Sequence, residues 1–166
     1  MSALRKSSPS ELANIFNPPN ATANQLKVIL RAICYVCYNY ENKRKFGKAG
    51  GCRGLASLFK STLSSGLVEL LCLAVVTTCQ ECSFNKTELG EAGGCEGLLS
   101  IVKQSYYYNI NALEKACKAI VCISSGNASN IDHFKRLKTG SGGFIFLNYI
   151  YIYIFTFFSL TGSSLL

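Results

Sequence analysis

The sequence predicts an all-α protein built from stacked helical repeats, which is a helical solenoid. The main observation is an internal repeat: residues 42–60, NKRKFGKAGGCRGLASLFK, return 43 positions later as residues 85–103, NKTELGEAGGCEGLLSIVK, with 11 of 19 positions identical. The second is the composition, because 166 residues with 49% hydrophobic and 16% charged side chains can bury one packed core. Such a repeat indicates units that bury their apolar faces against neighbouring copies.

The segment before the repeat divides into a polar part and a helix. Residues 1–23 are rich in serine and asparagine and contain the pair Pro18 and Pro19, so we predict a disordered linker there. Residues 25–40 place apolar side chains three and four positions apart, as at Leu26, Ile29 and Ile33. This spacing predicts an amphipathic helix with one buried side.

Each copy of the repeat is predicted to hold a short helix, a glycine corner and two longer helices. Glycine adopts the positive φ that a sharp corner between helices requires. The first copy gives a short helix at 42–49, a corner at Gly50 and Gly51, a helix at 52–60, a polar loop at 61–66 and a long helix at 67–83.

The second copy repeats this order and a third copy begins after it. The predicted elements are a short helix from Lys86, a corner at Gly93 and Gly94, a helix at 95–104, a loop at 107–109 and a long helix at 111–124. Asn130 and Phe134 then match the pairs Asn42 with Phe46 and Asn85 with Leu89. The third copy does not finish, which favours two full repeats with partial ones at both ends, across residues 24–138.

The positive charge is concentrated in the first third of the chain. The formal net charge is +8, and ten of the 17 basic residues lie in residues 1–60 with only two of the nine acids. A basic patch is predicted on the first repeat, at Lys43, Arg44, Lys45, Lys48 and Arg53. It is either a solvated helix face or a surface for an acidic partner; no nucleic-acid motif accompanies it, so nucleic acid is not expected as a partner.

The cysteines and the single histidine do not predict an enzyme, a metal site or a cofactor. Cys34 with Cys37 and Cys79 with Cys82 have a spacing that zinc or redox sites use, but both pairs lie in apolar helices. Small buried side chains are therefore the preferred interpretation. With nine cysteines and no apolar signal segment at the N-terminus, we expect a cytoplasmic protein with reduced thiols.

The composition changes abruptly after Gly140. Residues 144–160, FIFLNYIYIYIFTFFSL, carry no charge and follow Lys135, Arg136 and Lys138. As a helix this run would span roughly 25 Å, just under a typical hydrocarbon core. Residues 139–166 are therefore either a membrane anchor or a stretch of noncoding sequence translated in error. Tyrosine and isoleucine alternate strictly from Tyr149 to Ile154, as a translated run of TA dinucleotides would give. This alternation favours noncoding sequence, or a premature ending of a longer repeat protein, over an anchor.

The units resemble the armadillo repeat of beta-catenin and importin alpha. The resemblance rests on three helices in about forty residues, the Asn-x-x-x-[FL]-x-x-x-Gly-Gly corner and an alanine-rich third helix, and it covers residues 26–138. It implies a right-handed α-solenoid whose stacked third helices line a groove for peptides or proteins. In the family this groove commonly carries a tryptophan and an asparagine four positions apart.

We align the three long helices through Ala32, Ala74 and Ala119. The positions that match the family tryptophan and asparagine then hold neither tryptophan nor asparagine in this chain. They hold instead Arg31 and Tyr35, Leu73 and Thr77, and Lys118 and Cys122. The candidate groove residues that the resemblance implies are Arg31, Tyr35, Tyr38, Thr77 and Lys118. We therefore expect a non-enzymatic scaffold for a protein or peptide partner, with self-association possible through exposed repeat ends; the alternative is a tail-anchored membrane protein whose cytosolic repeats recruit partners.

Overall fold

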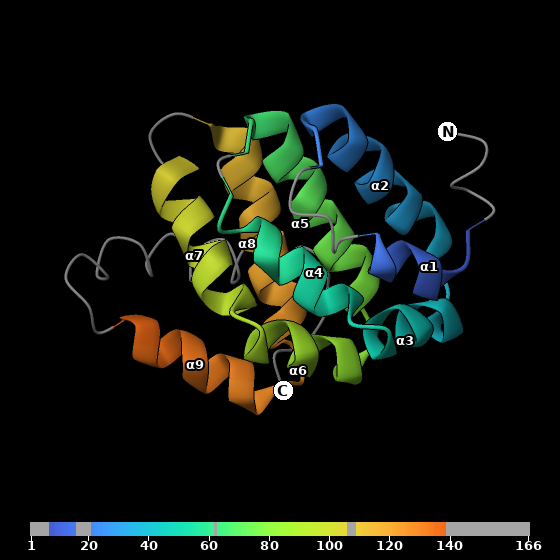
Figure 1. Ribbon diagram of the computed structural model, residues 1–166. Helices are drawn as coiled ribbons and strands as arrows, with labels where there is room; N and C mark the ends of the chain where they lie inside the picture. The colour runs from blue at the N-terminus through green and yellow to red at the C-terminus, as the bar shows by residue number, and fades with distance from the viewer. Residues whose placement is uncertain (1–6, 16–20, 62, 106–108, 139–166) are drawn as a thin grey trace.

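The computed structural model describes residues 7–15, 21–61, 63–105 and 109–138, and all regular structure in them is helical. Figure 1 shows how these helices pack together. They are α1 (Pro9–Asn14), α2 (Ala23–Val36), α3 (Tyr40–Lys48), α4 (Gly51–Leu58), α5 (Ser65–Cys79), α6 (Ser83–Glu91), α7 (Gly94–Ser105), α8 (Ile110–Ser124) and α9 (Ala128–Lys138).

The helices pack in three rows that follow the sequence repeat. The long helices form one row, in which α5 lies between α2 and α8. The short helices form a second row, in which α6 contacts α3 on one side and α9 on the other, along the lower edge of Figure 1. The third row is α1, α4 and α7. Equivalent segments of the two sequence copies therefore contact equivalent neighbours.

Local sequence signals explain where these helices begin. The Thr22 hydroxyl accepts a hydrogen bond from the Gln25 amide at 3.3 Å, while the Gln25 side chain accepts one from the Thr22 amide at 2.8 Å. Asn39 caps α3 by accepting from the Asn42 amide at 2.8 Å, and Asn109 caps α8. These side chains satisfy amide groups that have no partner within the helix.

The predicted glycine corners occupy matching places in the two copies. Gly50 and Gly93 have φ values of 85° and 93°, which a side chain would make unfavourable. The glycine that follows each of them begins the next helix, and a Cβ on Gly51 would lie 2.4 Å from the Phe46 ring. A Cβ on Gly94 would lie 2.7 Å from Leu89. Phe46 and Leu89, which the repeat pairs with each other, therefore cover the two corners.

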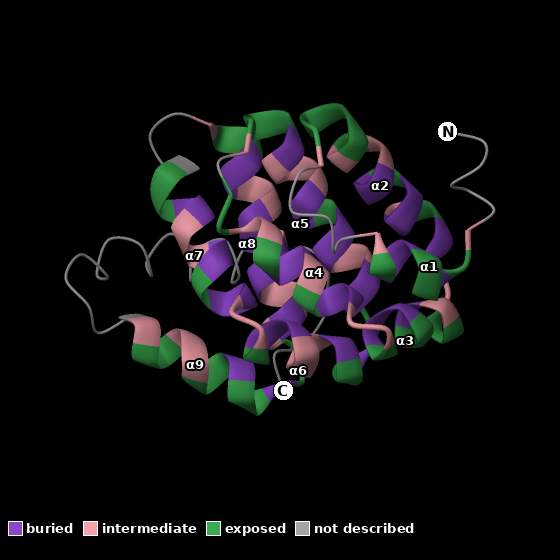
Figure 2. Cartoon of the chain, in the orientation of Figure 1, coloured by how far each residue is buried: buried purple, intermediate pink, exposed green. Residues whose placement is uncertain are grey.

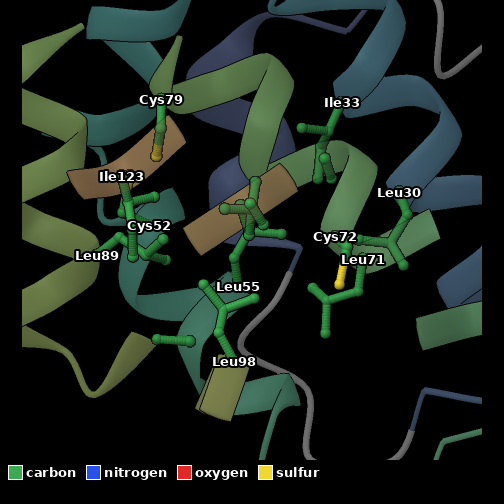
Figure 3. Close-up of a cluster of buried hydrophobic side chains, with 14 of the residues drawn as sticks. Leu30, Ile33, Cys52, Leu55, Leu71, Cys72, Cys79, Leu89, Leu98 and Ile123 are labelled. Carbon is green, nitrogen blue, oxygen red and sulfur yellow. The ribbon is translucent and has the colours of Figure 1, made fainter. Parts of the chain in front are cut away.

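The core runs continuously through all three rows. Figure 3 shows part of it, with buried side chains converging from α2, α4, α5 and α8. Leu30, Ile33, Leu55, Leu71, Leu98 and Ile123 are fully buried. Figure 2 shows buried positions concentrated where helices meet, and exposed positions on the outer sides of α3 and α9.

One part of the predicted linker is wrong, because residues 9–14 form helix α1. Ser8 and Glu11 make reciprocal capping hydrogen bonds, and Pro9 stands in the first turn, where proline is favourable. Leu12 is fully buried, and α1 packs on α3 and α4. The adjacent prolines that suggested a linker, Pro18 and Pro19, lie outside the described residues.

Two predicted boundaries are also corrected. The first helix ends at Val36, four residues before the predicted end, and α5 ends at Cys79, so that α6 already begins at Ser83. In both places the sequence stays apolar beyond the helix end, because Cys37 and Cys82 are buried in the turn between helices. The hydrophobic tail at residues 139–166 lies outside the described residues.

Candidate functional site

The row of α2, α5 and α8 presents one continuous outer face. Contacts between equivalent positions set its register: the Cys122 thiol of α8 donates to the Val76 carbonyl of α5 at 3.8 Å, and Thr77 of α5 lies beside the Cys34 thiol of α2. The positions aligned through Ala32, Ala74 and Ala119 therefore follow one another across the three helices. Four of the five residues predicted for the groove lie on these helices.

The middle of this face is apolar and its first helix is aromatic and basic. Tyr35 on α2 is 57% exposed, and Tyr38, just after α2, is 73% exposed. Arg31 is exposed one turn before Tyr35. On α5, Leu73 is 46% exposed, although sequence reasoning named Thr77 rather than Leu73 for the groove. Helix α5 is apolar on all sides, so its pattern does not reveal which leucine points outward.

The polar groups on this face already have partners inside the chain. The Thr77 hydroxyl donates to the Leu73 carbonyl at 2.9 Å, and the Lys118 ammonium lies 2.6 Å from the Glu114 carboxylate. The hydrogen bond from Lys118 lowers the pKa of Glu114. Lys118 therefore contributes less net charge to the face than its sequence position suggests.

A second set of repeated residues holds the units together from inside. The Asn85 amide group donates at 2.8 Å to the Thr78 carbonyl of α5 and at 2.8 Å to the Lys43 carbonyl of α3, both in the preceding unit. Asn130 repeats this arrangement with the Ile123 carbonyl at 3.0 Å and the Lys86 carbonyl at 2.9 Å. Both side chains are buried. We call this set the asparagine contact.

A glycine makes room for each asparagine contact. A Cβ on Gly47 would lie 1.9 Å from the Asn85 side-chain oxygen, and a Cβ on Gly90 would lie 1.9 Å from that of Asn130. The Asn85 oxygen is buried and has no N–H or O–H donor among the described residues. It points at the Cα–H of Gly47, which supplies the weak kind of hydrogen bond that also links neighbouring strands in sheets.

A lysine joins the short helix of each unit to the end of that unit's long helix. The Lys43 ammonium donates at 2.8 Å to the Gln80 carbonyl at the end of α5, and Lys86 donates at 2.5 Å to the Ser125 carbonyl at the end of α8. A cation at a helix C-terminus satisfies its last carbonyls and the helix dipole. We call this the lysine cap. The sequence signal for both contacts is the identity of Asn-Lys and of the glycine in the two copies.

The lysine cap corrects the predicted basic patch. Lys43 is only 8% exposed and is directed at the end of α5, so it does not share a surface with Arg44, Lys45 and Lys48. Lys45 pairs with Glu41 at 2.7 Å.

Arg53, on the following helix, lies 3.5 Å from Glu88. Two of the four exposed basic side chains are thus neutralised by carboxylates of the chain itself. The surface around α3 is mixed in charge rather than a concentrated basic patch.

Most of the nine free cysteines stay protonated, and therefore unreactive, at neutral pH. Burial raises the pKa of Cys37, Cys72, Cys95 and Cys122 to about 12 and that of Cys117 to about 11. A hydrogen bond with Cys52, together with burial, raises the pKa of Cys79. Since the thiolate is the reactive form, these side chains act as core filler, which the apolar spacing predicted.

The histidine has a partner that the sequence did not suggest. His133 on α9 lies 2.7 Å from Glu96 on α7, whereas its neighbour Asp132 pairs with Lys135. Among the described residues, no group of three histidine, cysteine or acidic side chains could hold a metal ion. No helix in the described ranges is long and apolar enough to cross a membrane.

The chain matches no family model, and comparison with curated proteins gives no significant match.

Proposed function

We propose that the described residues form an armadillo-type solenoid whose face of α2, α5 and α8 binds a protein or peptide partner. Support for the fold comes from equivalent packing: the two asparagine contacts join neighbouring units in the same way, and the two lysine caps close each unit in the same way. A right-handed superhelix is the twist that the resemblance implies. In this proposal the protein is a scaffold and not an enzyme.

The observation that carries the binding proposal is the exposed apolar side chain of Leu73 between two chemically different neighbours. Tyr35 and Arg31 lie on the α2 side, and Lys118 lies on the α8 side. A leucine that is 46% exposed on a helix packed from both sides leaves apolar area in water. Covering Leu73 and Tyr35 would supply most of the favourable free energy, because aromatic and apolar anchors usually dominate such contacts.

This face differs from the family groove in how it would hold a partner. The family asparagine binds the partner backbone with its amide, and the matching positions here hold Tyr35, Thr77 and Cys122. The Thr77 hydroxyl is already used by its own helix. Recognition through side-chain packing is therefore proposed in place of recognition through the partner's backbone.

A quantitative affinity capture with the full chain tests the proposal. The bait is compared with a face variant, Tyr35→Ala with Leu73→Ser and Lys118→Ala, and with a control variant, Lys60→Ala with Ser57→Ala and Lys103→Ala, at exposed positions after or within α4 and α7. We expect a protein that wild type and control retain equally and the face variant loses at least tenfold. Equal retention by all three folded baits would contradict the binding face.

A further inference from the structure

Three positions of the repeat determine how successive units pack. Inside the molecule, each of them holds a residue type that allows this packing. Gly47 and Gly90 leave space for the asparagine of the next unit. Lys43 and Lys86 cap the long helix that follows them within the same unit, α5 and α8. Thr77 and Cys122 are small side chains that touch the preceding long helix.

The same three positions change at the two ends of the described array. In α9, Lys135 stands where the first two copies have glycine, and Ile131 stands where they have the capping lysine. Ile131 is 38% exposed. On α2, Tyr35 occupies the position of Thr77 and Cys122 and is 57% exposed. Each fitting residue is therefore lost on the two faces that no neighbouring unit covers within the described residues 7–15, 21–61, 63–105 and 109–138.

These two end faces are complementary halves of one repeat. Helix α9 corresponds to the short helices α3 and α6, because its asparagine contact is the same as theirs with the preceding unit. Helices α1 and α2 correspond to α4 and α5, since α1 packs on α3 as α4 packs on α6. The α9 helix of one copy and the α1 and α2 helices of a second copy would together make a whole unit. Such a head-to-tail contact does not close and can continue into a filament.

We propose that Tyr35, Ile131 and Lys135 keep a second copy of this chain from stacking on the end of the first. In a stacked pair, Asn42 of the second copy would enter the place that Gly47 and Gly90 leave open. At the matching position Lys135 carries a Cβ, and the end of its side chain pairs with Asp132 at 3.0 Å. By equivalence with the interior contacts, the Lys135 Cβ would meet the asparagine oxygen at a distance that no real contact allows. Ile131 has no ammonium group to cap the second copy's α2. The buried carbonyl groups at the C-terminus of that helix would therefore remain unpaired.

Tyr35 acts from the other side of the same contact. Thr77 and Cys122 let neighbouring long helices approach because their side chains are short. A tyrosine ring at this position holds an incoming α8 away from α2. Asn42 itself donates to the Val36 carbonyl at 2.7 Å and is half-buried, so it remains oriented as its two counterparts are. The inference concerns the ends of the array and does not require the binding face proposed above.

Sedimentation of the full chain over a wide concentration range tests this proposal. We expect wild type to sediment as a monomer. The variant Tyr35→Thr with Ile131→Lys and Lys135→Gly restores the interior residues and is expected to form dimers and larger species as concentration rises. Adding Asn42→Ala to that variant is expected to return it to a monomer, which distinguishes stacking of units from association through the apolar tail.

A matched control carries the same kinds of change at exposed positions outside the contact: Tyr38→Thr, Ser129→Lys and Arg136→Gly. It is expected to stay monomeric. The pair Tyr35→Thr with Ile131→Lys keeps Lys135 and is expected to stay monomeric, because the Lys135 Cβ still excludes Asn42. A monomeric restored variant with wild-type helix content would overturn the proposal, and so would association of the pair as strong as that of the restored variant. So would association of wild type that Asn42→Ala abolishes.

Discussion

Asn85 is the residue whose environment is most completely determined, because both of its amide hydrogens are used and its oxygen lies against a glycine. The side chain is fully buried and joins two units separated by about one repeat in sequence. A buried amide of this kind contributes stability only while every neighbour keeps its position. The repeated sequence Asn-Lys-x-x-x-Gly is therefore the chemical basis of stacking in this chain.

Replacing Asn85 by alanine is expected to lower the free energy of unfolding by about 2 to 4 kcal/mol, because two buried carbonyls lose their donor. Asn42→Ala is the matched control, since Asn42 is half-buried and, among the described residues, its side chain donates only to the Val36 carbonyl at the end of α2. Its cost is expected to be about 1 kcal/mol. Urea unfolding followed by circular dichroism measures both values, and equal costs would contradict the role assigned to Asn85.

The glycine opposite Asn85 is expected to show coupling in a double-mutant cycle. Gly47→Ala alone should destabilise the protein by about 2 kcal/mol or more, because the new methyl group meets the Asn85 oxygen. In the Asn85→Ala background the same change should cost little, since alanine favours the helix over glycine. Additive costs from denaturant unfolding would show that the two residues do not touch.

At the scale of the element, the sequence predicted helices wherever apolar side chains recur every three or four residues, and it predicted the corners at Gly50 and Gly93. Helix α1 was missed because it is short and its buried side is mainly Leu12, so composition dominated the prediction. The pairing of His133 with Glu96 and the lysine caps join residues far apart in sequence. A single sequence contains no signal for which distant partners meet.

Helix α1 is expected to be part of the cooperative fold. Leu12→Ala removes a fully buried side chain between α1 and α3 and should lower the free energy of unfolding by about 2 to 4 kcal/mol. Glu11→Ala, which removes one capping partner at an exposed position, should cost about 1 kcal/mol or less. A Leu12→Ala cost near zero would place α1 outside the fold.

The buried thiols predict a loss of stability in alkaline solution. Folding raises the pKa of Cys72 from its usual value of 9.0 to about 12, so between these values the unfolded chain releases a proton that the folded chain keeps. The stability from this group is complete below pH 9 and declines as pH rises toward 12, by up to roughly 1.4 kcal/mol per pH unit. Cys72→Val should reduce this slope in unfolding measurements across the range, and an unchanged slope would contradict the assignment.

At the scale of the whole molecule, the proposed binding face follows the row of long helices, and the proposed closed ends lie at α2 and α9. Tyr35 and Leu73 are exposed on the long helices, Lys118 is half-buried, and the asparagine contacts join successive units. The resemblance supplied the candidate groove residues one by one, and their role in binding stays a prediction. Leu73 was not among them, because its exposure depends on how α5 packs between its two neighbours.

The positive net charge is distributed over the molecule rather than concentrated in a single basic surface. Lys43 and Lys86 donate hydrogen bonds to carbonyl groups at helix C-termini. Lys45, Lys118 and Lys135 each form an ion pair with an acidic side chain. A count of charges along the sequence cannot reveal this, because the acids and carbonyls involved become neighbours only in the fold.

Side-chain amide resonances of the two buried asparagines offer the most direct test of how the units stack. In nuclear Overhauser spectra of the labelled chain, the Asn85 amide protons are expected to show cross-peaks to the backbone of residues 43 and 44. Those of Asn130 should show the corresponding cross-peaks to residues 86 and 87. Cross-peaks confined to each asparagine's own unit would contradict the stacked arrangement on which the binding face and the closed ends both depend.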